Sequence, residues 1–193
     1  MANRKTLTYK YLGVTVDEKL TWEEHCKHLC CTISKYVGVM YKVKHYVNNQ
    51  ALHMLYHSLI NSRGQYGIIA WGRAASCHLQ PISVILNRAM KCLNTDKLVT
   101  NIVTTIYKTQ KIIQLKDIYN LEVSKFMYKY TTSQLSATFD NYFELITDVH
   151  SYNTRQIKSR KFALPKARSN SGAKMIKCSA IEIWSKIPLQ IKK

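Results

Sequence analysis

Apolar side chains recur at steps of three and four residues through much of the first half of the chain. This spacing lines up one face of an α-helix and would bury it against a neighbour. Thr21, followed by Glu24 as the second half of a capping box, and Asn48 are candidate caps at the starts of the first two helices. The sequence therefore predicts a compact bundle of three antiparallel helices. Their apolar faces comprise Leu29, Ile33, Tyr36, Val37 and Met40; Leu52, Leu55, Tyr56, Leu59 and Ile60; and Leu79, Ile82, Leu86, Ala89 and Leu93.

Both flanks of this bundle carry further expected elements. The stretch from Thr6 to Val16 is rich in β-branched and aromatic residues that roughly alternate, which indicates a short strand or hairpin with a close backbone approach at Gly13. Residues 99–113 and 116–130 are two more helix candidates, and the second has an apolar face. The predicted fold is mainly α, in four segments: a strand segment 1–20, a helical bundle 21–95, a second helical segment 96–150 and a basic extension 151–193, which is expected to be mostly irregular and to end in a short docked helix. The apolar face of the helix expected over 116–130 comprises Tyr119, Val123, Phe126, Met127 and Tyr130.

The charge of the chain is strongly positive. Its 193 residues include 29 lysines and arginines against 11 acidic residues, a net charge of +18, which favours a polyanionic partner such as nucleic acid. Residues 153–193 contain a single acid, Glu182, and are the most basic part. Tyrosines alternate with lysines, as around Tyr41 and Lys42. They would either stack on bases or pack in the core with their hydroxyls reaching water.

These patterns give a set of candidate phosphate contacts. Lysine and arginine neutralise phosphates, although a run of lysines can equally form an ordinary solvated face. The candidates lie along the first long helix and in the basic extension. They are Lys35, Lys42, Lys44, Arg155, Lys158, Arg160, Lys161, Lys166 and Arg168.

Motifs for catalysis or metal binding are not evident in the sequence. Two-metal sites need several converging carboxylates, but the adjacent acids here are only Asp17-Glu18, at an expected turn, and Glu23-Glu24, at an expected helix start. Histidines and cysteines gather between His25 and Cys31, and His53 and His57 are four residues apart, yet neither pattern matches a common zinc motif. We therefore expect no catalytic residue, no metal site and no cofactor.

Six cysteines occur without an amino-terminal signal-peptide pattern, and no run of about 18 apolar residues is present. Reduced thiols in an intracellular protein, nuclear or cytoplasmic, are the expectation. We expect no membrane segment.

Several short motifs, taken in order, resemble one family. Tyr11-Leu-Gly-Val-Thr-Val-Asp17 and the following Leu20-Thr-Trp22 with His25 are similar to the region after the polymerase palm in non-LTR (LINE-type, jockey-like) retrotransposon reverse transcriptases. Later motifs look like the thumb, post-thumb and carboxy-terminal regions of those proteins, and together the matches run from about Tyr9 to Ile191. These later motifs are Leu55-Tyr56, Tyr66 to Gly72, Asn87 to Met90, Leu121 to Tyr130, His150 to Arg155 and Ala180 to Pro188.

The resemblance implies a truncated reverse transcriptase fragment. In the family the catalytic aspartates lie in the palm, upstream of the Tyr-Leu-Gly segment, so Mg²⁺ is expected only for a complete polymerase. The thumb grips a primer-template duplex, which makes RNA or an RNA/DNA duplex the expected partner and other retrotransposon proteins further candidates. Two alternatives stay open: a host-retained protein-docking module that uses the Trp71 and Trp184 regions, or a translated remnant whose unpaired strand at Tyr11 to Val16 would cause aggregation.

Overall fold

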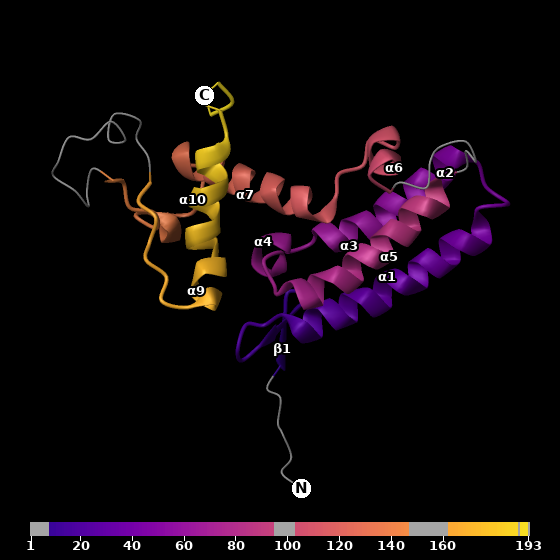
Figure 1. Ribbon diagram of the computed structural model, residues 1–193, viewed down its shortest axis with the longest axis horizontal. Helices are drawn as coiled ribbons and strands as arrows, with labels where there is room; N and C mark the ends of the chain where they lie inside the picture. The colour runs from indigo at the N-terminus through magenta and orange to yellow at the C-terminus, as the bar shows by residue number, and fades with distance from the viewer. Residues whose placement is uncertain (1–7, 95–102, 147–161, 189, 193) are drawn as a thin grey trace, which may run out of the picture. The chain divides into compact units, whose positions relative to one another are not determined.

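The computed structural model describes residues 8–94, 103–146, 162–188 and 190–192 (Figure 1). It is mainly helical and begins with a two-stranded antiparallel sheet, which confirms the predicted fold class. The chain divides into two compact units, Met1–Ile118 and Tyr119–Lys193.

The first unit opens with a hairpin rather than one continuous strand. Strand β1 (Thr8–Tyr11) pairs with β2 (Val14–Asp17), so that Tyr11 lies opposite Val14. Leu12 and Gly13 form the connection, with φ angles of 45° and 84°. Two-residue hairpin turns favour positive φ, and glycine adopts it without steric cost. The hairpin, one of the two forms predicted for this stretch, is therefore confirmed, and the residues from Tyr11 to Val16 do not form an unpaired strand.

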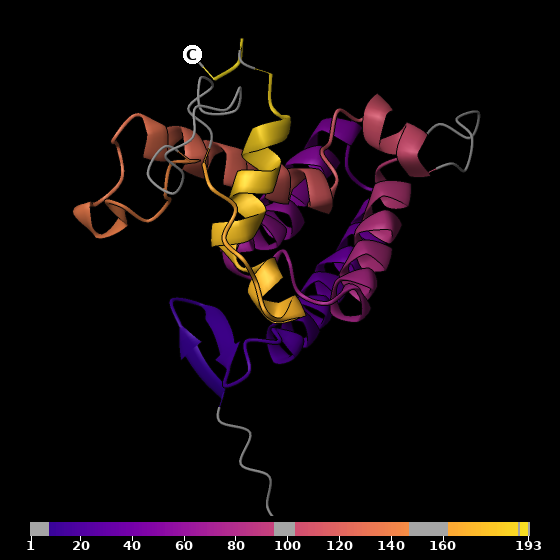
Figure 2. The ribbon, with the colours of Figure 1, turned by 60° about the vertical axis from the view of Figure 1, so that its left-hand side comes forward.

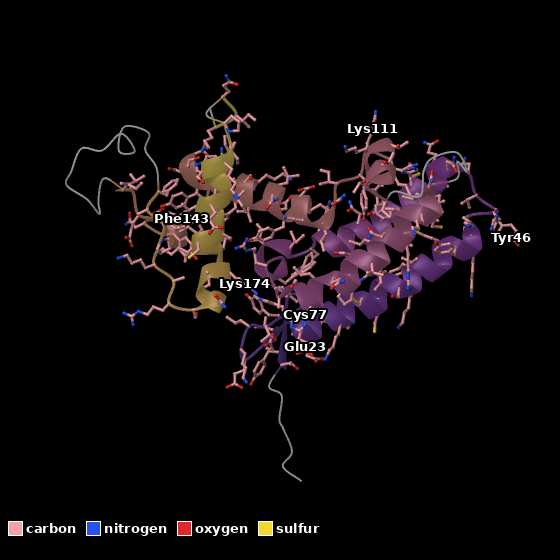
Figure 3. All side chains as sticks on the ribbon, in the orientation of Figure 1. Glu23, Tyr46, Cys77, Lys111, Phe143 and Lys174 are labelled. Carbon is pink, nitrogen blue, oxygen red and sulfur yellow. The ribbon has the colours of Figure 1, made fainter. Side chains whose placement is uncertain are left out.

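A hydrogen-bonded turn joins the hairpin to the first long helix, α1 (Glu23–Val43). The Asp17 carboxylate accepts hydrogen bonds from the Thr21 and Trp22 amides at 2.8 and 2.7 Å and from the Thr21 hydroxyl at 2.8 Å. The Thr21 hydroxyl also accepts a long hydrogen bond from the Glu23 amide at 3.4 Å. The N-cap position is nevertheless Trp22, with φ 65° and no side-chain cap, so the predicted capping box of Thr21 and Glu24 is not formed. Glu23, labelled in Figure 3, pairs with Lys27 in the first turn.

Three antiparallel helical segments form the bundle of the first unit, as predicted. α1 packs along α5 (Ser76–Leu93). A third helical rod runs in the opposite direction and packs against both of them: α2 (Asn49–Leu55), the π-helical turn η1 (Tyr56–Asn61) and α3 (Ser62–Gln65) (Figures 1 and 2). Asn48 caps the rod, since its side chain accepts a hydrogen bond from the Ala51 amide at 2.8 Å. The predicted stripes are buried at Leu29, Ile33, Val37, Met40, Leu52, Tyr56, Ile60, Ile82, Leu86, Ala89 and Leu93.

The π turn has a physical cause in the spacing of the buried residues. Leu52, Tyr56, Ile60 and Gly64 are all buried and are separated by steps of four. In an α-helix each such step overshoots a full turn by about 40°, so the buried line would drift around the rod. One wide turn holds more residues and returns the line to the same face.

Short elements close the first unit. α4 (Ile68–Trp71) follows the rod, and Trp71 is fully buried, with its indole N–H donating to the Tyr66 carbonyl at 2.9 Å. α6 (Val103–Thr109) packs on α5 and is followed by Lys111 with φ 54°. The helix expected over 99–113 thus ends earlier than predicted, at Thr109. Residues 99–102 lie outside the described residues.

The second unit contains most of α7 (Leu115–Thr131), the turn η2 (Ala137–Phe139), α9 (Asn170–Lys174) and α10 (Ile176–Lys186). Tyr119, Val123 and Met127 of α7 are buried, as the predicted apolar face requires. The Tyr119 hydroxyl and the Ser179 hydroxyl, both buried, are 2.8 Å apart and tie α7 to α10. Phe143, labelled in Figure 3, packs edge-on against Tyr130 and Tyr142.

Candidate nucleic-acid interface

Lys35 and Lys42 share the outer face of α1. Seven residues separate them, which is close to two turns, so their side chains leave the helix in the same direction about 10.5 Å apart along its axis. Both are exposed, and a Cβ placed on Gly38 between them would meet open space. Among the described residues, no carboxylate forms an ion pair with either lysine. This face presents two unneutralised cations.

Lys44 does not belong to that face. It follows the end of α1 and is half-buried, with its ammonium nitrogen 5.0 Å from the centre of the Tyr41 ring. The Tyr41 hydroxyl donates to the Arg88 carbonyl of α5 at 3.3 Å. Burial raises the pKa of Tyr41, and the Cys92 thiol raises it further, while Arg88 opposes this shift. The structure therefore groups Lys44 with Tyr41 and Arg88 at the far end of α1.

A second arginine-tyrosine contact lies between α3 and α1. The Arg63 guanidinium donates to the Tyr36 hydroxyl at 2.9 Å and stacks over the Tyr36 ring, 4.9 Å from its centre. Tyr36 directly follows Lys35 in the sequence. Sequence reasoning missed Arg63 because nothing in its local pattern indicates the contact across the bundle.

One signal for these additional cations is visible in the sequence. No aspartate or glutamate occurs between Glu24 and Asp96, a span that holds nearly all of the three-helix bundle. Beyond the first turn of α1, the residues of this span therefore contribute no carboxylate to the surface of the bundle. The cations of the same span are Lys27, Lys35, Lys42, Lys44, Arg63, Arg73, Arg88 and Lys91.

The predicted contacts of the basic extension are described only in part. Lys166 and Arg168 are exposed in the segment that leads to α9. Lys174, labelled in Figure 3, is the last residue of α9 and is also exposed. Arg155, Lys158, Arg160 and Lys161 lie outside the described residues.

His25 and Cys26 are buried beneath the hairpin. The Thr15 amide donates to His25 Nδ1 at 3.3 Å, and the His25 ring lies 5.5 Å from the Trp71 ring. Burial lowers the pKa of His25, with a contribution from His28, and burial raises the pKa of the Cys26 thiol to about 12. The imidazole is therefore neutral and the thiol is protonated at neutral pH. Because the thiolate is the reactive form of cysteine, we interpret both side chains as packing residues beneath the hairpin.

The remaining motifs occupy ordinary positions. His53 is half-buried and His57 is exposed on the rod, where the Asn61 side-chain nitrogen lies 3.3 Å from His57 Nδ1. Within the described ranges, no group of three or more histidine, cysteine or acidic side chains is placed to hold a metal ion. Trp71 is fully buried, so its side chain does not form part of the surface that the alternative of a protein-docking module requires.

No family model, curated protein or solved structure matches this chain. Over the residues that the structure describes, no helix combines the length and apolar character needed to cross a membrane.

Proposed function

We propose that this chain is the thumb and post-thumb part of a non-LTR retrotransposon reverse transcriptase, and that it binds RNA or RNA/DNA duplexes through phosphate contacts. The observation that supports this best is the acid-free, basic bundle surface that includes Lys35 and Lys42. A polyanion gains most where no carboxylate of the protein competes for the same cations.

The proposal gives the bundle a positioning role on the duplex. Phosphate contacts fix the orientation of a protein on a duplex and carry no direct sequence information. Lys35 and Lys42 would contact phosphates of one strand about three nucleotides apart, given a spacing of about 3.4 Å per nucleotide along the axis. Binding should therefore depend on charge and duplex geometry more than on base sequence.

No catalytic step is assigned to this chain alone. The family resemblance places the metal-binding aspartates of the polymerase upstream of Tyr11. Asp17, the acid nearest to that segment, has both carboxylate oxygens engaged by Thr21 and Trp22. Mg²⁺ thus belongs to the complete polymerase, and we expect no polymerisation by the isolated chain.

Fluorescence anisotropy with a labelled RNA/DNA hybrid tests the proposal. The titration is repeated at several salt concentrations and with single-stranded RNA of the same sequence, and size exclusion verifies that the protein is folded. We expect log affinity to fall steeply with log salt, by about 0.9 for each phosphate contact, and to be greater for the hybrid than for the single strand. A folded protein that does not bind the hybrid at low salt would contradict the proposal and favour a protein-docking module.

A further inference from the structure

A groove of about 330 Å³ lies within the second unit, between α7 and the end of α10. Tyr128 and Lys129 belong to its α7 wall, and Trp184, Ile187 and Ile191 form its other wall. Its lining is mostly apolar, although it opens to solvent. The volume is at the lower end of the range of about 300 to 1,000 Å³ that is typical of sites for small organic groups.

Two aromatic side chains line this groove. Tyr128 is 40% exposed on α7, although the neighbouring Met127 is fully buried, so the Tyr128 ring is not part of the core. Trp184 is half-buried on α10, and its ring carries the Lys192 ammonium 5.1 Å from its centre. Indole and phenol rings are the surfaces on which flat heterocycles stack.

Cations surround the apolar lining. Lys125 and Lys129 line the α7 wall, and Lys192 lies over Trp184. Lys125 is paired with Glu122 at 2.7 Å, whereas no carboxylate among the described residues forms an ion pair with Lys129. A flat apolar group attached to an anion would satisfy both parts of this groove. An uncharged apolar segment would leave the lysines unused.

We propose that this groove binds an unpaired base of single-stranded RNA or DNA. The base stacks on Trp184 and Tyr128, and the adjoining phosphate lies near Lys129. The inference rests on the proposed nucleic-acid function and extends it, because the groove provides a site for a single-stranded segment that adjoins the duplex. Stacking tolerates any base, so we expect no strong sequence preference.

The test compares two labelled RNA/DNA hybrids by fluorescence anisotropy: one is blunt, and the other carries a short single-stranded overhang. We expect the protein to bind the overhang hybrid about tenfold more tightly, the order of magnitude of one stacked base. Tyr128→Ala and Trp184→Leu should each reduce this advantage severalfold and leave the affinity for the blunt hybrid unchanged. Tyr46→Ala is the matched control, because Tyr46 is 89% exposed beyond α1 and lies outside the groove (Figure 3).

A second measurement keeps the test decisive if Trp184→Leu disturbs the packing of α10. An overhang that contains 5-iodouracil is irradiated on the unchanged protein, and the cross-linked peptide is identified by mass spectrometry. Cross-links at Trp184 or Tyr128 support the inference, and cross-links confined to other surfaces overturn it.

The outcomes distinguish a failure of the proposed base site from a failure of the proposed nucleic-acid function. Equal affinity for the two hybrids, or an overhang advantage that survives both groove substitutions, overturns the base site and leaves duplex binding intact. Failure to bind either hybrid overturns the proposed function together with the inference. An acidic peptide that binds the protein but not Tyr128→Ala, without displacing the oligonucleotide, assigns the groove to a protein partner and also overturns the inference.

Discussion

Gly67 lies close to the hairpin and has a positive φ angle, which favours glycine over other residues. Its φ angle is 62°, and a Cβ at this position would lie 3.0 Å from the Val14 side chain. We therefore expect Gly67→Ala to lower the free energy of unfolding by about 1 to 3 kcal/mol, through backbone strain and the displacement of Val14. Urea unfolding followed by circular dichroism measures the change.

Gly38→Ala is the matched control for that substitution. Gly38 lies inside α1, and its Cβ would meet open space. Because alanine is the better helix former, we expect this variant to gain about 0.5 to 1 kcal/mol. Equal effects at the two glycines would contradict the steric argument for Gly67.

His25 makes stability depend on pH. Burial and His28 lower its pKa from the ordinary value of 6.5, so the folded chain binds the proton only at a lower pH than the unfolded chain does. Its contribution is thus fully present above pH 6.5 and is lost as the pH falls from about 6.5 toward the folded-state pKa.

We expect His25→Phe, which keeps a ring beside Trp71 but cannot be protonated, to show a flatter loss of stability between about pH 7 and pH 5. Urea midpoints at several pH values, with His53→Phe on the rod as the control, measure this slope. A slope for His25→Phe as steep as that of the unchanged protein would show that other groups cause the acid sensitivity.

At the scale of elements, α1 carries both the core stripe and the open basic face. We expect the double variant Lys35→Glu with Lys42→Glu to weaken binding to an RNA/DNA hybrid at least tenfold. It should also reduce the salt slope by about two, because two phosphate contacts are lost. Lys108→Glu with Lys111→Glu is the control of equal charge change, on and just after α6, where Lys111 is exposed (Figure 3). Equal losses for both pairs would show that only net charge matters.

The helices and their buried faces were predictable because their periodicity is set by local geometry. The stripes from Leu29 to Met40 and from Ile82 to Leu93 follow from spacing alone. The junctions were less predictable, because side chains shape them through contacts that local spacing does not show. Thr21 is a residue type that caps helices, but the turn that Asp17 forms with Thr21 and Trp22 puts Trp22 at the N-cap position.

The candidate site was also predictable only where it depends on local spacing. The spacing of Lys35 and Lys42 placed them together, whereas the Arg63 contact with Tyr36 and the groove beside Trp184 depend on tertiary packing. The turn at Leu12 and Gly13 shows a similar limit, since one glycine is compatible with both a bent strand and a hairpin.

At the scale of the whole molecule, the net charge of +18 opposes compaction. We expect the melting temperature of the free protein to rise by several degrees as sodium chloride increases from about 10 mM to about 150 mM. Over this range the Debye length falls from about 30 Å to about 8 Å, and like charges are screened. Differential scanning fluorimetry without nucleic acid measures the shift.

The variant with both Lys35→Glu and Lys42→Glu tests the cause of that shift. Its net charge is lower, so its melting temperature should depend less on salt than that of the unchanged protein. A melting temperature that falls with salt in the unchanged protein would mean that attractive ion pairs outweigh the repulsion.

The π turn at Tyr56–Asn61 gives this bundle a tolerance for change in chain length. Removing one residue from it, such as the exposed Ser58, lets the rod continue as an ordinary α-helix, with its buried residues at steps of four, three and four. The buried residues at the two ends of the rod then stay on the same face, and the variant with this deletion should fold. An equivalent deletion at Ser34 in α1 would rotate everything beyond it by about 100° and separate Ile33 from Val37 and Met40 on the core face. Among descendants of one ancestral chain, single-residue gaps should therefore collect in this turn of the rod and be rare in the middle of α1.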